Sequence, residues 1–361
     1  LNEASTSQQL NVGDLMRHHT ALVRKSPPLQ HAKDDDIASS WNSVEETLKE
    51  ERDKDMVPTY LSSWLTAQGD RKTDRMAYSA LKDYSRNKFY HNNTWNKDDF
   101  SGWMNRIQEA SMEFRQIVFP EIGDPYHLSM KSIELLAKQH RPLFLCGLLA
   151  FEKYNLKAEM RRLINIFEFM TIKGVEFPSL IGANGITSQN RYTFVDKYCK
   201  ELYTQSNEFR TNMGHAKAKT ILDSFAAEVK TQCSSIWSGA AADPALPTIT
   251  GWDDTSLSDL EINQSLAKLL LSRIEIEAGG TKTWASDFEV EHILPQTWTD
   301  EWADNTKGGG FSNRDQAKEY LNKLGNKTLL DPGSNKTLSN SNFLDKQSHT
   351  TAGYDLQSTD W

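Results

Sequence analysis

The sequence predicts a mainly α-helical protein, in which a helical bundle is followed by a small C-terminal unit of two strands and a helix. Apolar residues recur at helical spacing through nearly all of the chain before about residue 280, and strands are expected only beyond that point. A hydrophobic share of 38% is ample for a core. A chain of 361 residues favours two domains. We place a helical region, expected to serve as a scaffold that positions a ligand, at residues 1–280 and the second domain at residues 281–361.

The helices can be assigned in order along the chain. Residues 99–118 carry large apolar side chains three or four positions apart, and Pro120 ends this helix. Pro142 opens a short apolar helix to residue 154. Residues 158–172 are too apolar for a helix with one buried face, so this pair is expected at the centre of the bundle. Further helices are expected at residues 36–51, 191–205, 216–232 and 257–277.

The C-terminal unit begins after two breaks in the helical pattern. Residues 234–254 are rich in Gly, Ala, Pro and Thr and predict a long loop, and the glycines of residues 278–281 end the preceding helix. The first strand is expected at residues 288–290 and the second after Gly325. The insertion between them should hold a helix from about Ser312. Ser339 or Asn340 is expected to cap a final helix that includes Lys346.

A carboxylate beside a histidine, followed by two asparagines, is the most informative pattern in this unit. Glu291-His292 is followed by Asn326 and then Asn335. Neutral imidazole can take a proton from water near pH 7, and one carboxylate with one amide oxygen can hold Mg²⁺ or Mn²⁺. Hydrolysis of a phosphodiester needs such a base and such a cation. The pattern therefore predicts a nuclease.

The local backbone should deviate from a flat strand at this pattern. Adjacent side chains of a strand point to opposite faces, so Glu291 and His292 cannot both face one site from a regular ladder. A bend or bulge is expected there, with strand pairing ending at Pro295.

The same residues resemble a known family, the HNH or His-Me finger nucleases with a ββα-metal fold. The similarity is greatest to the C-terminal nuclease domain of GmrSD-like and SspE-like modification-dependent restriction endonucleases. Three segments carry it: Glu291-His292-Ile293-Leu294-Pro295-Gln296, Gly325-Asn326-Lys327-Thr328-Leu329-Leu330, and the run from Asn335 to Lys346 with its Asn340, Asn342 and Phe343.

The resemblance implies a role for each matching residue. His292 would be the general base, Glu291 and Asn335 the metal ligands, and Asn326 the residue that holds the loop of His292. Such a site cleaves one strand, so a monomer should nick DNA. Each residue also has a plainer interpretation, because Asn326 and Asn335 stand in ordinary turn compositions and Lys346 could be a solvated lysine.

Binding to DNA requires a local basic patch, because the net charge of the chain is −8. We expect contacts with DNA phosphates from Arg314, Lys327, Lys336 and Lys346. No apolar run is long enough for a transmembrane helix, and no signal peptide opens the sequence, so a cytoplasmic protein is expected.

The resemblance also implies a wider context. The relatives sense modified DNA through an N-terminal nucleotide-hydrolysing domain, whose D-G-Q-Q-R motif is absent from this sequence, so we expect a C-terminal fragment of a phage-defence protein. Two alternatives stay open: a catalytically silent DNA-binding or scaffold module, and a ribonuclease with the same metal chemistry.

Overall fold

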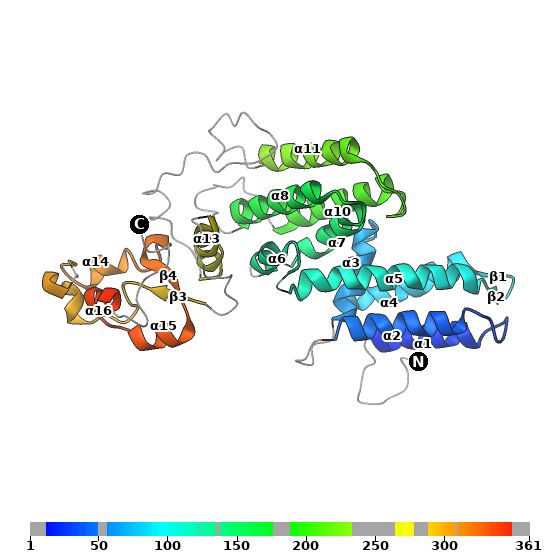
Figure 1. The fold of residues 1–361 in the computed structure, drawn as a ribbon, viewed down its shortest axis with the longest axis horizontal. Coiled ribbons are helices and arrows are strands. Elements are labelled where there is room, and N and C mark those ends of the chain that lie inside the picture. Colours follow the sequence, from blue (N-terminus) through cyan, green and yellow to red (C-terminus); the bar gives the residue numbers. More distant parts are fainter. Residues whose placement is uncertain are drawn as a thin grey trace. The chain divides into compact units, whose positions relative to one another are not determined.

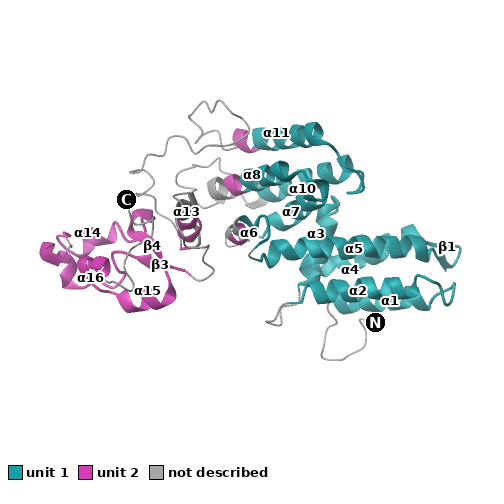
Figure 2. Cartoon of the chain, in the orientation of Figure 1, with its two compact units in different colours: residues 1–130, 138–167, 188–228 teal, residues 131–137, 168–187, 229–361 magenta. Residues whose placement is uncertain are grey.

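A computed structural model describes residues 12–49, 56–121, 123–134, 138–175, 188–232, 264–277, 288–307 and 310–348. These residues are mainly helical, as the sequence predicts. The chain divides into two compact units (Figure 2). Unit 1 comprises residues 1–130, 138–167 and 188–228, and unit 2 comprises residues 131–137, 168–187 and 229–361. Within the described ranges, no helix combines the length and the apolar character needed to cross a membrane.

Unit 1 is a helical bundle (Figure 1). In it, α2 packs against α5, and α7 packs against α3, α5 and α10. The helices that lie wholly or partly in this unit are α1 (Val12–Lys25), α2 (Asp34–Thr47), α3 (Val57–Ala67), α4 (Asp74–Phe89), α5 (Lys97–Val118), α6 (His127–Glu134), α7 (His140–Ala150), α8 (Lys157–Val175), α10 (Ser188–Gln205) and α11 (His215–Gln232).

The short apolar helix α7 lies at the centre of this bundle, as predicted. Every residue of α7 except Pro142 is buried. Gly147 allows α8 to approach closely, because a Cβ atom at this position would lie 2.6 Å from both Leu163 Cδ2 and Met160 Sδ. The apolar character of both helices in the sequence therefore reflects burial on several sides.

Two features of unit 1 were not predicted from the sequence. Lys97 is buried, and its ammonium donates hydrogen bonds to Asp34 Oδ1 at 2.8 Å and to the carbonyl oxygens of Arg24 and Pro28. A short hairpin, β1 (Tyr90–His91) and β2 (Thr94–Trp95), joins α4 to α5. Its turn is formed by two asparagines at positive φ, a conformation that asparagine tolerates better than most residues.

Unit 2 contains a two-stranded antiparallel sheet, β3 (Glu289–His292) and β4 (Lys327–Leu330). The helix α13 (Gln264–Glu277) packs against both strands. Three short helices complete the unit: α14 (Arg314–Lys318) between the strands, then α15 (Pro332–Leu338) and α16 (Phe343–Ser348) after them. The predicted domain boundary at residue 280 stays a prediction, because residues 278–287 lie outside the described ranges, as do the predicted loop at 234–254 and the start of the helix predicted at 257–277.

A small apolar core supports the segment between the two strands. Leu294, Trp302 and Ala317 are buried in it. Four partly buried side chains pack around them, namely Trp298, Phe311, Leu321 and Phe343. This core connects the residues that follow β3 with α14 and α16, so it fixes the position of the segment after His292.

The structure corrects two local predictions in this unit and confirms the approximate start of a third element. Residues 332–338 form the helix α15, where turn composition had suggested only a turn, because Pro332 occupies the first helical turn and Asp331 accepts a hydrogen bond from Ser334 N. The last helix is capped by Asn342, whose Oδ1 accepts from Asp345 N, and neither Ser339 nor Asn340 has this role. The inserted helix starts at Arg314, two residues after Ser312.

Candidate functional site

The predicted motif lies at the end of strand β3. Glu291 pairs with Thr328 and His292 with Lys327, so the ladder is regular through His292. Of the expected bend or bulge, no bulge lies within the strand, and pairing ends at His292, before Pro295. The chain bends immediately afterwards, at residues 293 and 294. His292 is the last residue of β3, so its side chain is not constrained by further strand pairing.

An open polar cavity of about 300 Å³ forms beside this strand end. It brings together the adjacent residues Glu291 and His292 with Asn335, which the sequence analysis selected from two separate segments. The other residues that line it are Glu289, Pro295, Gln296, Thr297, Lys336, Ser339 and Asn340. The cavity therefore combines β3, the bend after it, and α15.

Glu291 forms a buried ion pair with Lys346. Only 7% of Glu291 is exposed, and Lys346 is fully buried. The Lys346 ammonium lies 2.5 Å from Glu291 Oε1 and also donates to the carbonyl oxygens of His292 and Ile293. Burial raises the pKa of the Glu291 carboxyl even though the ammonium opposes the shift, and burial lowers the pKa of Lys346 in spite of the carboxylate. The cost of removing both charges from water therefore outweighs their attraction.

His292 is held in its neutral form. Burial lowers the pKa of His292 to about 4, and the nearby charges of Lys327 and Lys346 add to this effect. The imidazole is therefore unprotonated near pH 7 and able to accept a proton.

Asn326 fixes the chain just beyond His292. Its Oδ1 accepts a hydrogen bond of 2.6 Å from Leu294 N, and its Nδ2 donates to the carbonyl oxygens of Leu294 and Leu321. The backbone carbonyl of Asn326 also accepts from Ile293 N at 2.9 Å. These contacts are the geometry that the predicted role of Asn326 requires.

Glu289 is a site residue that the sequence analysis missed. Its Oε2 accepts a hydrogen bond from Asn335 Nδ2 at 2.8 Å, and Glu289 and Glu291 share one face of β3 because side chains alternate along a strand. This alternation was the signal in the sequence that could have identified it.

The four basic residues predicted to contact DNA divide into two pairs. Lys336 and Arg314 are exposed, and Lys336 lines the cavity. Lys327 is buried, with its ammonium 3.1 Å from the carbonyl oxygen of Asn322, and Lys346 is occupied by Glu291. In this structure the predicted phosphate contact therefore does not fit Lys327 or Lys346, because the ammonium groups of both bind the protein itself.

The oxygen atoms at the cavity suit a hard divalent cation. Among the described residues, no three side chains of His, Cys, Asp or Glu gather in a way that could hold a metal ion. Glu289, Glu291 and Asn335 instead offer two carboxylates and one amide, and Asn335 Oδ1 accepts no hydrogen bond from the described residues. Mg²⁺ and Mn²⁺ accept such a set because they keep several water ligands, whereas Zn²⁺ prefers nitrogen and sulfur.

Comparison with known protein families agrees with this assignment of the C-terminal region. Residues 253–358 match the C-terminal domain of the GmrSD restriction endonucleases. The match contains every residue that lines the cavity. Among curated proteins, none matches the chain. The GmrSD-type C-terminal domain thus includes every residue that the sequence analysis proposed for the site.

Proposed function

We propose that this protein is a metal-dependent DNA endonuclease that nicks duplex DNA, and that its C-terminal domain is an HNH nuclease with the ββα-metal arrangement. The observation that carries the proposal is the cavity at the end of β3, where Glu291, His292 and Asn335 meet within a region similar to a restriction endonuclease domain. Two antiparallel strands followed by short helices are also the elements that this arrangement requires.

In the proposed mechanism, His292 takes the proton from an attacking water molecule. Its lowered pKa keeps the imidazole neutral at pH 7, so every molecule carries the base in its active form. Asn326 limits movement of the bend after His292 through its hydrogen bonds to Leu294. A base that is held in place needs less reorganisation to reach the water.

Glu291 and Asn335 would hold the divalent cation, with Glu289 as a third ligand. A bound Mg²⁺ or Mn²⁺ supplies positive charge that polarises the scissile phosphate and stabilises the leaving oxygen. Lys346 keeps the Glu291 carboxylate oriented and partly neutralised while it lies in a buried position. The exposed side chains of Lys336 and Arg314 would bind the phosphate backbone.

The wider context is proposed on the same basis. A restriction role in phage defence, a cytoplasmic location, recognition of modified DNA, and cooperation with an N-terminal nucleotide-hydrolysing domain all follow from the resemblance to GmrSD-like proteins. A single site of this type cuts one strand, so a double-strand break would need two copies or two binding events.

The direct test is cleavage of supercoiled plasmid by the purified chain with Mg²⁺ or Mn²⁺, beside a reaction that contains EDTA. Open-circle product that needs the metal is expected. If the plasmid stays supercoiled with every metal, either the chain is a silent module or the site needs the N-terminal nucleotide-hydrolysing domain, and the same assay on a protein that includes that domain distinguishes the two. A single-stranded RNA of matched sequence is included, because cleavage of the RNA but not of the DNA would assign a ribonuclease.

A further inference from the structure

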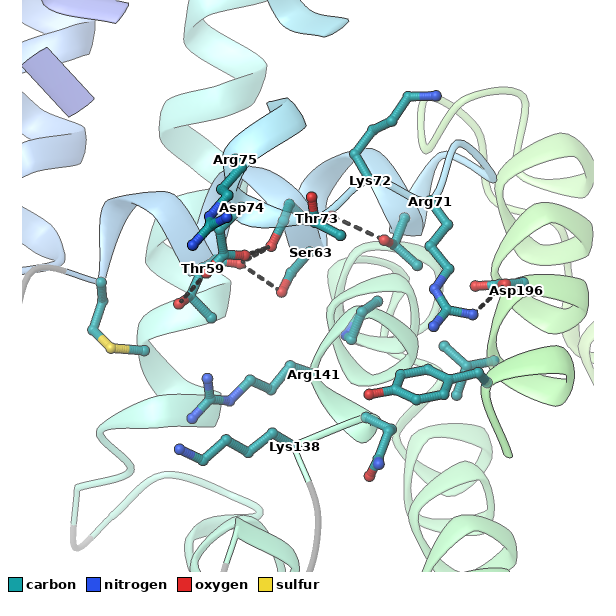
Figure 3. A pocket seen from close by; sticks show the side chains of 17 residues that line it. Thr59, Ser63, Arg71, Lys72, Thr73, Asp74, Arg75, Lys138, Arg141 and Asp196 are labelled. Carbon is teal, nitrogen blue, oxygen red and sulfur yellow. Dashed lines mark hydrogen bonds and ion pairs between the residues drawn. The ribbon is translucent and has the colours of Figure 1, made fainter. Parts of the chain in front are cut away.

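Unit 1 contains a second and larger cavity, of about 890 Å³. It is lined by residues 56–75 of α3, α4 and the turn between them, by the start of α7, and by α10 (Figure 3). None of these residues belongs to the cavity beside β3, and the proposed mechanism does not use them. The basic side chains in its lining are Arg71, Lys72, Arg75, Lys138 and Arg141.

The lining of this cavity contains more basic than acidic side chains. Only two carboxylates line it, Asp74 and Asp196. Asp74 accepts a hydrogen bond from Ser62 Oγ at 2.6 Å, and Asp196 Oδ2 pairs with Arg71 at 3.2 Å. Arg75 and Lys138 are exposed, and neither has a carboxylate partner among the described residues. An acidic protein therefore concentrates unneutralised cations in one hollow, which favours an anionic ligand.

The start of α7 adds to this preference. Arg141 lies in the first turn of α7 and is only 7% exposed, so its guanidinium acts at the edge of the protein interior, where charges are less screened. In Figure 3, Arg141 and Lys138 extend in the same direction from the beginning of this helix. The N-terminal end of a helix also attracts anions through its dipole and its unpaired N–H groups.

Two further groups distinguish a nucleic acid from a simple anion. Tyr192 lines the cavity with its ring 3.9 Å from the Arg71 guanidinium, a combination of aromatic and cationic groups that suits bases and phosphates together. Asp196 Oδ1 is buried and accepts no hydrogen bond within the described residues, so it can receive an N–H group from a ligand. Neither feature serves a bare phosphate ion.

We propose that this cavity binds a DNA strand, with Arg75 and Lys138 in contact with its phosphates, an inference that rests on the proposed nuclease function. The cations come from two separate segments on the cavity wall, residues 71–75 and residues 138–141, and the cavity is open. An open basic groove of this kind can follow a backbone with several phosphates, whereas a free nucleotide offers its phosphates at one end.

The test measures binding of a fluorescent DNA oligonucleotide by anisotropy at several salt concentrations, with EDTA present so that no cleavage occurs. The double variant Arg75→Gln with Lys138→Gln is compared with a control, Lys25→Gln with Lys217→Gln. The control removes two exposed cations of unit 1 that lie outside the cavity. Each lost phosphate contact reduces the slope of log Kd against log salt by about 1. A slope smaller by about 2 in the cavity variant alone supports the proposal, and equal slopes in the two variants overturn it.

Two further arms separate the possible outcomes. Millimolar ATP or a deoxynucleoside monophosphate is added as a competitor. Displacement of DNA that depends on Arg75 and Lys138 would assign a nucleotide site and overturn the DNA assignment. Melting temperatures confirm that both variants are folded. Binding is measured without cleavage, so the two proposals can fail separately. An active nuclease whose salt slope does not depend on Arg75 and Lys138 refutes only this inference. An inactive chain whose salt slope does depend on them refutes only the proposed function.

Discussion

At the scale of single residues, the site is controlled by charges that are buried together. Lys346 and Glu291 form a pair in which burial outweighs attraction, as the opposite directions of their pKa shifts show. The sequence pattern identified both residues but predicted that Lys346 contacts DNA, because a lysine on a terminal helix is usually solvated. Its actual partners are visible only once the bend after β3 and α16 are in place.

Replacing Lys346 by methionine should destabilise the C-terminal domain. The change leaves the Glu291 carboxylate buried without its counter-ion, which costs roughly 3 kcal/mol. Adding Glu291→Gln to Lys346→Met should recover part of this loss, because the uncompensated charge is then absent. Thermal unfolding of the wild type, both single variants and the double variant measures the coupling. An unchanged melting temperature for Lys346→Met would mean that the pair is not formed.

A second buried residue, His19, should make unit 1 sensitive to acid. Burial, with a smaller effect of Lys82, lowers the pKa of His19 to about 4, and its Nε2 lies 2.8 Å from Ser85 Oγ. The unfolded chain binds this proton from about pH 6.5 downward, whereas the folded chain resists it until about pH 4. The stabilisation is therefore complete above pH 6.5 and is lost as the pH falls through this range, by at most about 3 kcal/mol.

The measurement is the free energy of unfolding between pH 4 and pH 8. His19→Gln should flatten the acid limb, while the control His91→Gln, at an exposed position of β1, should leave it as in the wild type. A parallel acid limb in wild type and His19→Gln would show that another group is responsible.

At the scale of elements, close helix packing depends on small residues at defined places. Gly147→Ala should destabilise unit 1 by about 1–3 kcal/mol, because the added Cβ would meet Leu163 and Met160 of α8 at 2.6 Å. Gly102→Ala in α5 is the matched control. Its nearest neighbour would be Arg106 Nη1 at 4.0 Å, so the higher helix propensity of alanine should stabilise by about 1 kcal/mol. Urea unfolding of the two variants should give changes of opposite sign, and a stabilised Gly147→Ala would refute the close α7–α8 packing.

The predicted elements show what local pattern can and cannot determine. The helices at residues 99–118, 158–172 and 216–232 are found within a few residues of their predicted bounds, because their apolar spacing is long and regular. The hairpin β1–β2 was missed because two-residue strands have no periodicity to detect. The helix α15 was missed because Pro332, Gly333 and Ser334 have turn composition, although the cap at Asp331 and a proline in the first turn both favour a helix.

The residues of the candidate site were also predicted only in part from the sequence. Glu291, His292, Asn326 and Asn335 were selected from the sequence, and Glu291, His292 and Asn335 line one cavity, with Asn326 bound to the segment beside it. Glu289 was missed, and Lys327 and Lys346 were placed on the surface, because burial and cross-element hydrogen bonds depend on the folded arrangement. The sequence pattern thus selected residues that lie at one cavity, and packing determined which charged side chains face that cavity.

At the scale of the whole molecule, two cavities with different lining residues have different proposed functions. The cavity beside β3 carries the groups for hydrolysis, and the basic cavity of unit 1 carries groups suited to a DNA strand. The net charge of −8 of the whole chain weakens non-specific contact with DNA. Binding and cutting should therefore be separable by mutation.

The most direct test of the central claim is the rate at which His292→Ala nicks supercoiled plasmid with Mg²⁺ or Mn²⁺, compared with the wild type and with His91→Ala as a folded control. Loss of the general base should slow formation of open-circle product by about 100-fold or more, while His91→Ala nicks at the wild-type rate. Equal rates for His292→Ala and the wild type would contradict the account, because the nuclease activity would then not come from the site at the end of β3.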